Sequence, residues 1–177
     1  MHADDVLSFM RRLNEADIRA WLDGGWGVDA LVGRQTRTHA DLDLAVDVLA
    51  LPQVTALLKQ DGYRVLRDEL PTAVAYRHDG SGRELDLHPL VITEDGGGDQ
   101  AQPDGREPWH YGVPVTGYVA GQPVPCCSLE TQLRAHQGYP PRDSDRADMA
   151  VLAEHFGCEL PGAYGLGGAG TGGQRSG

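Results

Sequence analysis

The chain has 177 residues, of which 40% are hydrophobic and 23% charged, a balance typical of one ordinary folded domain that excludes a disordered or collagen-like chain. The 15 Lys and Arg residues against 26 Asp and Glu residues give a net charge of −11, which disfavours binding to a long nucleic acid and favours a small or cationic substrate. No apolar run approaches the roughly 20 residues of a membrane span, and the acidic N-terminus lacks a basic signal-peptide start. We therefore expect a cytoplasmic protein with no nucleic-acid or membrane partner.

The first third of the chain alternates between helical and extended patterns. Apolar residues at helical spacing predict an amphipathic helix over residues 4–17, followed by a short strand over 18–22. The run Asp23-Gly24-Gly25 predicts a tight turn, and a second helix then runs from Trp26 to Leu31 and stops at Gly33. Polar and apolar residues alternate from Asp41 to Asp47, which indicates a half-buried strand.

The remainder of the chain adds further strands and then two helices. We predict a helix over 51–61, strands over 63–66, 72–78 and 84–90, and an antiparallel hairpin made by the last two strands around the turn 79–82. Residues 94–106 lack periodicity and predict a long exposed loop. Ser128 is expected to cap a helix to about residue 137, and Asp143 or Ser144 another to His155. We expect a domain over 1–120, a helical C-terminal segment over 121–160, and a disordered tail over 161–177.

Two carboxylates lie side by side on the alternating strand. Asp41 and Asp43 are two residues apart, so they project from the same face while Leu42 and Leu44 point into the core. Such a pair stays ionised only beside compensating positive charge, and Mg²⁺ is the usual partner of hard oxygen ligands. Asp86 occupies the equivalent place on a later strand. If the two strands are neighbours, which no sequence rule fixes, three carboxylates could hold two metal ions.

Phosphate-binding features precede these acids. Gly24 and Gly25 offer backbone N–H groups at a helix N-terminus with no Cβ in the way. Arg37 and His39 lie between this turn and the acidic pair. They could contact a phosphate, or they could equally be exposed basic residues on a loop. The pattern favours a triphosphate held by the glycine turn, with in-line attack on phosphorus by a substrate hydroxyl.

Several motifs together resemble one family. The chain is similar, in order and spacing, to the small lincosamide nucleotidyltransferases of the DNA polymerase β-like superfamily, over residues of about 18–152. The matching stretches are Trp21-Leu22-Asp23-Gly24-Gly25-Trp26-Gly27-Val28-Asp29, Gly33 to Asp43, Leu85-Asp86-Leu87-His88-Pro89, Pro125-Cys126-Cys127-Ser128 and His136-Gln137-Gly138-Tyr139.

The resemblance implies a mixed twisted α/β sheet flanked by helices, with a short helical C-terminal segment. It implies transfer of AMP from ATP, with Mg²⁺, to a hydroxyl of lincomycin or clindamycin, which inactivates the antibiotic. Asp41 and Asp43 would be metal ligands, and Asp86 a ligand, the general base or both. A homodimer is compatible with the resemblance.

Other interpretations stay open. Related aminoglycoside nucleotidyltransferases share the core signature, and a nucleotide-binding module without transfer activity would share the fold. Three other classes fit less of the sequence. A dinucleotide-binding domain needs repeated strand–helix crossovers, and a calcium loop needs an oxygen ligand at its fifth position, which this sequence does not have. For a DxD glycosyltransferase the chain is short.

The remaining candidate residues have structural alternatives. Trp109, Tyr111 and Tyr139 are candidates for an acceptor pocket, although core packing would explain each equally well. We expect Asp29 to be a structural hydrogen-bond acceptor and Trp21 to pack in the core. Three cysteines, none at CxxC spacing, indicate free thiols and no disulfide framework or zinc ribbon.

Overall fold

A computed structural model describes residues 1–164 of the chain. Its helices are α1 (Ala3–Glu15), α2 (Gly24–Val32), α3 (Leu51–Gln60), α4 (Leu129–Ala135) and α5 (Asp143–Phe156), with short 3₁₀ turns at Val48–Ala50 and Pro103–Gly105. Its strands are β1 (Ala20–Asp23), β2 (Asp41–Asp47), β3 (Tyr63–Glu69), β4 (Ala73–His78), β5 (Glu84–Ile92), β6 (Gly98–Gln100), β7 (Trp109–Tyr111), β8 (Val115–Val119) and β9 (Gln122–Cys126). No helix within residues 1–164 is long and apolar enough to cross a membrane.

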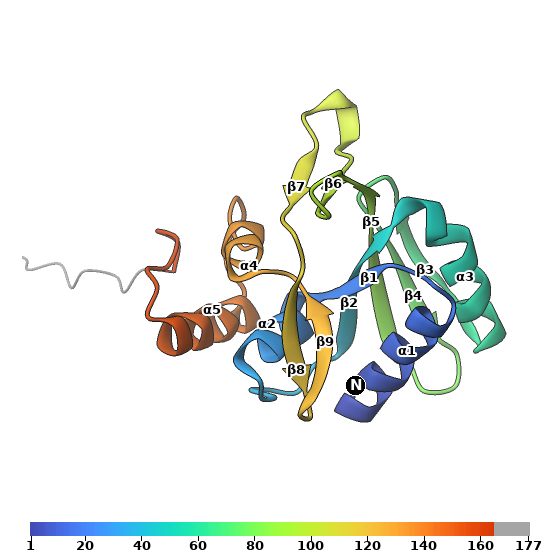
Figure 1. The fold of residues 1–177 in the computed structure, drawn as a ribbon, viewed down its shortest axis with the longest axis horizontal. Helices are drawn as coiled ribbons and strands as arrows, with labels where there is room; N and C mark the ends of the chain where they lie inside the picture. The colour runs from blue at the N-terminus through green and yellow to red at the C-terminus, as the bar shows by residue number, and fades with distance from the viewer. Residues whose placement is uncertain (165–177) are drawn as a thin grey trace, which may run out of the picture.

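The strands form one mixed sheet in the order β3-β4-β5-β2-β1-β9-β8. β2 pairs with β5 in parallel, β1 pairs with β9 in parallel, and the other neighbours are antiparallel, including the expected hairpin of β4 and β5. Figure 1 shows α4 and α5 at one end of the molecule, α3 at the other, and β6 and β7 in an arm that projects beyond the sheet. The mixed sheet flanked by helices confirms the predicted fold class.

One face of the sheet carries the main core. Leu42 and Leu44 of β2 and Leu85 and Leu87 of β5 are at most 1% exposed, and they pack with apolar residues of α1 and α3. Full burial of each such side chain contributes about 1.5–3 kcal/mol. A slip of one residue in register would move all of them to the opposite face. The same alternation that buries these leucines therefore fixes the aspartates between them on the other face.

The second half of the chain differs from expectation in one region. The predicted long exposed loop over 94–106 contains β6, which pairs with β5 and β7, and its Gly98 and Gln100 are buried. The β6 register leaves no room for a side chain at residue 98, because a Cβ there would lie 2.9 Å from that of Leu90. Strand pairing thus explains the glycine at residue 98.

The C-terminal helices follow the prediction closely. Ser128 caps α4 by accepting a hydrogen bond from the backbone N–H of Thr131. The N-cap of α5 is Arg142, one residue before the expected caps, and Asp145 accepts from its backbone N–H. Of the segment expected to be disordered, residues 161–164 are described, with Tyr164 buried against α5. The rest of that expectation lies outside the described residues, and the proposed domain boundaries stay predictions.

Candidate active site

Three aspartates form a row across the middle of the sheet. In the strand registers, Asp23 of β1 faces Asp43 of β2, and Asp43 faces Asp86 of β5. Asp41 lies two residues before Asp43 on the same side of β2. The strands that carry Asp43 and Asp86 are therefore neighbours in the sheet, as assumed from the sequence. Asp41, Asp43 and Asp86 all line one cleft with a volume of about 720 Å³.

The carboxylates of this row repel one another. Burial, and then the charge of Asp43, raises the pKa of Asp41 and likewise that of Asp86. Arg67 offsets part of this charge, since its Nη2 lies 3.5 Å from Oδ2 of Asp86. The site is thus a concentration of negative charge that a cation would stabilise.

His88 borders the same row on β5. Its Nε2 lies 3.5 Å from Oδ1 of Asp43. Burial by itself lowers the pKa of His88, but the hydrogen bond to Asp43 and the charges of Asp23, Asp43 and Asp86 outweigh burial and raise the pKa to about 9. His88 is therefore a hydrogen-bonded neighbour of the carboxylates.

The glycine turn is the start of α2, and each glycine is required for a different reason. Gly24 has a φ of +53°, and a Cβ on it would lie 2.2 Å from Oδ2 of Asp43. A Cβ on Gly25 would lie 2.5 Å from both Nη2 of Arg37 and Nδ1 of His39. The helix N-terminus can approach the acidic row and these basic side chains only because both residues lack side chains.

The two basic residues behind the turn have different positions. Arg37 lines the cleft and makes a two-pronged ion pair with Asp148 of α5, at 2.8 and 2.7 Å. His39 is 1% exposed, does not line the cleft, and hydrogen-bonds to Asp29. Asp29 also accepts hydrogen bonds from the backbone and hydroxyl of Thr36, as its expected structural role requires. The burial of His39 differs from the expectation that it contacts phosphate directly. Its side chain packs against Gly25 on the side of the turn away from the cleft.

The aromatic candidates all line the cleft, and Tyr111, which is 4% exposed, also packs in a core cluster with Trp21. Trp109 and Tyr111 of β7 pack edge to face, with ring centroids 4.4 Å apart, and Tyr139 lies between α4 and α5. The hydroxyl of Tyr111 donates a 3.0 Å hydrogen bond to Asp23. Burial and the charge of Asp23 raise the pKa of Tyr111 well above its ordinary value, so this phenol stays protonated.

Sequence reasoning did not single out several residues that line this cleft, among them Asp23, Gln132, Arg134 and Asp148. Asp23 is 6% exposed and accepts hydrogen bonds from the N–H of Gly24 and from the amide of Gln132, at 2.8 and 3.3 Å. Arg134 of α4 and Asp148 of α5 also line the cleft. For Asp23 the signal was available, because it directly precedes the glycine pair. Gln132, Arg134 and Asp148 lie on helices, where a polar residue in the sequence is usually assigned to the solvent-exposed face.

The acidic row suits a magnesium ion held partly by its substrate. Among the described residues, no three His, Cys, Asp or Glu side chains are already placed as a metal site. Mg²⁺, however, usually takes one or two protein carboxylates and completes its shell with water and substrate phosphates. Asp41 and Asp43 offer two such carboxylates on one strand face, and His88 and Arg67 offset part of the negative charge of the row.

A mixed sheet that carries a row of acids beside a glycine-initiated helix is the arrangement of a nucleotidyltransferase, and comparison with known proteins agrees. The aminoglycoside-2''-adenylyltransferase family model matches residues 5–152. A lincosamide resistance protein from Staphylococcus haemolyticus is 36% identical over 137 residues, which are 75% of this chain and 82% of that protein. A 2''-aminoglycoside nucleotidyltransferase from Escherichia coli is 30% identical over 66% of this chain and 62% of that protein.

Solved structures lead to the same class. The crystal structure of the lincosamide antibiotic adenylyltransferase LnuA with bound lincomycin matches with a TM-score of 0.76 and 30% identity, over 84% of this chain and 94% of that one. The solution structure of ANT(2'')-Ia shares the fold, with a TM-score of 0.68. The chain belongs to the aminoglycoside-2''-adenylyltransferase family and is a nucleotidyltransferase.

Proposed function

We propose that this enzyme transfers the AMP group of ATP to a hydroxyl of a lincosamide such as lincomycin or clindamycin, and so inactivates the antibiotic. The observation that carries the proposal is the in-register pairing of Asp43 with Asp86 beside the start of α2. The names of the lincosamide-specific relatives support the choice of acceptor.

The nucleotide side of the cleft binds the triphosphate of ATP. The backbone N–H of Gly25 and the positive end of the α2 dipole face the phosphates, whereas the N–H of Gly24 donates to Asp23. Arg37 lies against Gly25 and adds positive charge there. Asp41 and Asp43 would hold Mg²⁺, which neutralises charge on the phosphates when bound. A second ion shared with Asp86 stays a prediction.

The reaction itself is an in-line displacement. The acceptor hydroxyl oxygen forms a bond to the α-phosphorus while the bond from that phosphorus to the oxygen bridging to the β-phosphate breaks, and pyrophosphate leaves with the electron pair. Asp86 accepts the proton of the attacking hydroxyl on its carboxylate. Trp109, Tyr111 and Tyr139 form the apolar side that holds the acceptor.

Mass spectrometry tests the acceptor directly. The protein is incubated with ATP and Mg²⁺ and with lincomycin, clindamycin or each member of an aminoglycoside panel. We expect an AMP adduct on the lincosamides together with release of pyrophosphate. Adducts on aminoglycosides alone would favour the second candidate, an aminoglycoside nucleotidyltransferase, which the matching family model supports. No adduct on any drug would contradict both and favour a binding module.

A further inference from the structure

The lining of the cleft includes an arginine that lies over an aromatic ring. The guanidinium carbon of Arg134 lies 5.1 Å from the centroid of the Trp109 ring, and both residues line the cleft. This is a cation–π contact between α4 and β7. One face of the Trp109 indole is therefore covered by a permanent positive charge, since an arginine does not deprotonate in proteins.

No described carboxylate pairs with Arg134. Among residues 1–164 without Asp104, which are the residues whose side chains the structure describes, no Asp or Glu lies within ion-pair distance of it, and this includes Glu130, one turn earlier on α4. The nearby acids already have partners, because Asp145 binds Arg142 and Asp148 binds Arg37. Three other titratable groups lie near this wall. His136 carries no negative charge in either state, Tyr139 has a raised pKa and stays neutral, and the carboxylate of Asp23 accepts hydrogen bonds from Tyr111, Gln132 and Gly24.

The two sides of the cleft thus have opposite character. The row of Asp41, Asp43 and Asp86 is negative and serves the metal and the transfer reaction, whereas the wall formed by Trp109, Tyr111, Arg134 and Tyr139 is aromatic with an excess of positive charge. We propose that Arg134 is a specificity-determining residue that disfavours acceptors with several ammonium groups and favours acceptors with one amine or none.

This inference rests on the proposed function and refines it. A lincosamide carries one basic amine on a sugar-linked scaffold, so most of its surface is compatible with an aromatic wall. An aminoglycoside carries several ammonium groups, and one that approaches Trp109 meets a like charge. Because Arg134 is exposed to solvent, water and salt screen the repulsion, and the effect is a graded preference.

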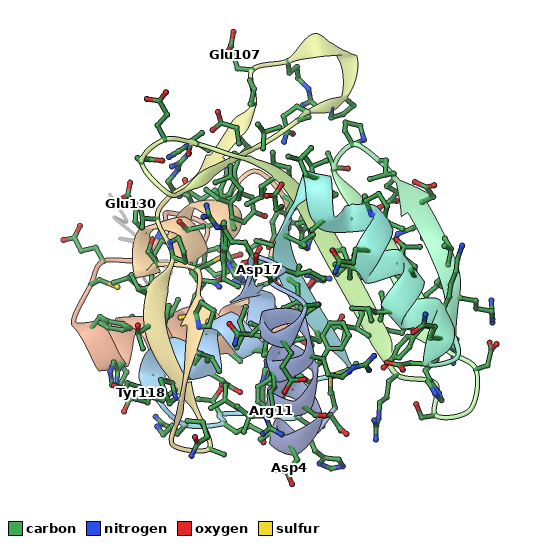
Figure 2. The ribbon with its side chains drawn as sticks, turned by 45° about the vertical axis from the view of Figure 1, so that its right-hand side comes forward. Asp4, Arg11, Asp17, Glu107, Tyr118 and Glu130 are labelled. Carbon is green, nitrogen blue, oxygen red and sulfur yellow. The ribbon has the colours of Figure 1, made fainter. Side chains whose placement is uncertain are left out.

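The test measures binding of tobramycin, a polycationic probe, by isothermal titration calorimetry. Arg134→Gln removes the charge, Arg134→Glu reverses it, and Arg134→Lys keeps it while altering the stacking. Arg11→Gln is the matched control, because it removes the same charge from the exposed surface of α1, away from the cleft (Figure 2). Thermal unfolding of each variant verifies that it is folded.

At low ionic strength we expect the tobramycin affinity to rise about three- to tenfold in Arg134→Gln and further in Arg134→Glu. It should stay within about twofold of wild type in Arg134→Lys and Arg11→Gln, and the gains should shrink at high salt. The inference is overturned by unchanged or unmeasurable affinity in both Arg134→Gln and Arg134→Glu, by an equal gain in Arg11→Gln, or by gains that salt does not reduce.

Failure of this inference differs from failure of the proposed function. The proposed function fails if the wild-type protein forms no lincosamide adduct, whatever tobramycin does. The calorimetric comparison between Arg134 variants needs no turnover, so it gives its result in either case.

Discussion

Asp43 stands at the centre of the site, between Asp23 on β1 and Asp86 on β5. Its carboxylate comes so close to the first residue of α2 that only glycine fits there. Metal, phosphate turn and acceptor base therefore meet around this one side chain in the proposed mechanism.

Replacement of Asp43 by Asn keeps the shape and removes the charge. We expect the rate of adenylyl transfer to fall by a factor of roughly 10²–10³ or more, because charge stabilisation in the transition state is lost, while ATP affinity changes by less than about tenfold. Product formation by mass spectrometry and ATP binding by calorimetry measure the two effects. Asp47→Asn, at the other end of β2 and outside the cleft, is the matched control. Unchanged turnover in Asp43→Asn would remove this residue from the mechanism.

Gly25→Ala adds a single methyl group at a buried contact. The methyl carbon would lie 2.5 Å from atoms of both Arg37 and His39, so we expect a loss of about 1–3 kcal/mol in unfolding free energy and weaker ATP binding. Urea denaturation and calorimetry provide the readouts. Gly162→Ala, whose Cβ would meet nothing within 4 Å, should leave both unchanged.

At the scale of single elements, the start of α5 depends on a buried carboxylate. Asp145 accepts hydrogen bonds from the backbone and guanidinium of Arg142. Burial by itself raises the pKa of Asp145, but these hydrogen bonds and the charge of Arg142 outweigh burial and lower it. A lowered folded-state pKa means that this contribution to stability is complete above the unfolded-state pKa and disappears as the pH falls through the folded-state pKa.

We therefore expect Asp145→Asn to destabilise the protein by about 1 kcal/mol at neutral pH. The difference from wild type should narrow as the pH falls below about 4. Urea unfolding at several pH values measures it, with Asp143→Asn as control, because Asp143 is exposed in the same first turn. A destabilisation that does not change with pH would contradict an ionic role for Asp145.

The elements also explain how far sequence reasoning reaches. β2 follows its predicted bounds of Asp41 and Asp47, because the alternation of aspartates and leucines at its start determines which face of the strand is apolar. β6, β7, β8 and β9 were not predicted. β9 holds Pro123 and Pro125 in five residues, a composition typical of a loop. Its strand character comes from pairing with β1, which is distant in the chain, and with the adjacent β8.

The same distinction holds for the site. The acids, the glycine turn and the aromatic candidates could be predicted from local motifs, and all of them line the cleft. Gln132, Arg134 and Asp148 could not, since their place there depends on how α4 and α5 pack against the sheet.

At the scale of the whole molecule, Arg37 and Asp148 join the phosphate side to the C-terminal helices. Asp148 is 2% exposed and sits 111 residues from Arg37 in the chain. Asp148→Ala removes both hydrogen bonds to Arg37, which is 29% exposed and can be solvated. We therefore expect a loss of about 1.5–3 kcal/mol of unfolding free energy and weaker ATP binding, because Arg37 is released.

A double-mutant cycle isolates the pair. Arg37→Ala, Asp148→Ala and the double variant are unfolded in urea, and the double variant should be clearly more stable than the sum of the two single losses predicts. Strict additivity would show that the ion pair does not hold the two parts together.

Asp23 has a consequence for how the two substrates influence each other. One carboxylate takes hydrogen bonds from Gly24 at the phosphate turn, Tyr111 on the arm and Gln132 on α4, so immobilising any of these donors restrains the other two. ATP and the antibiotic should consequently strengthen each other's binding by the same factor, as thermodynamic reciprocity demands. Tyr111→Phe removes the hydrogen bond from Tyr111 to Asp23. This variant should bring the factor close to one when either ligand is titrated with and without the other.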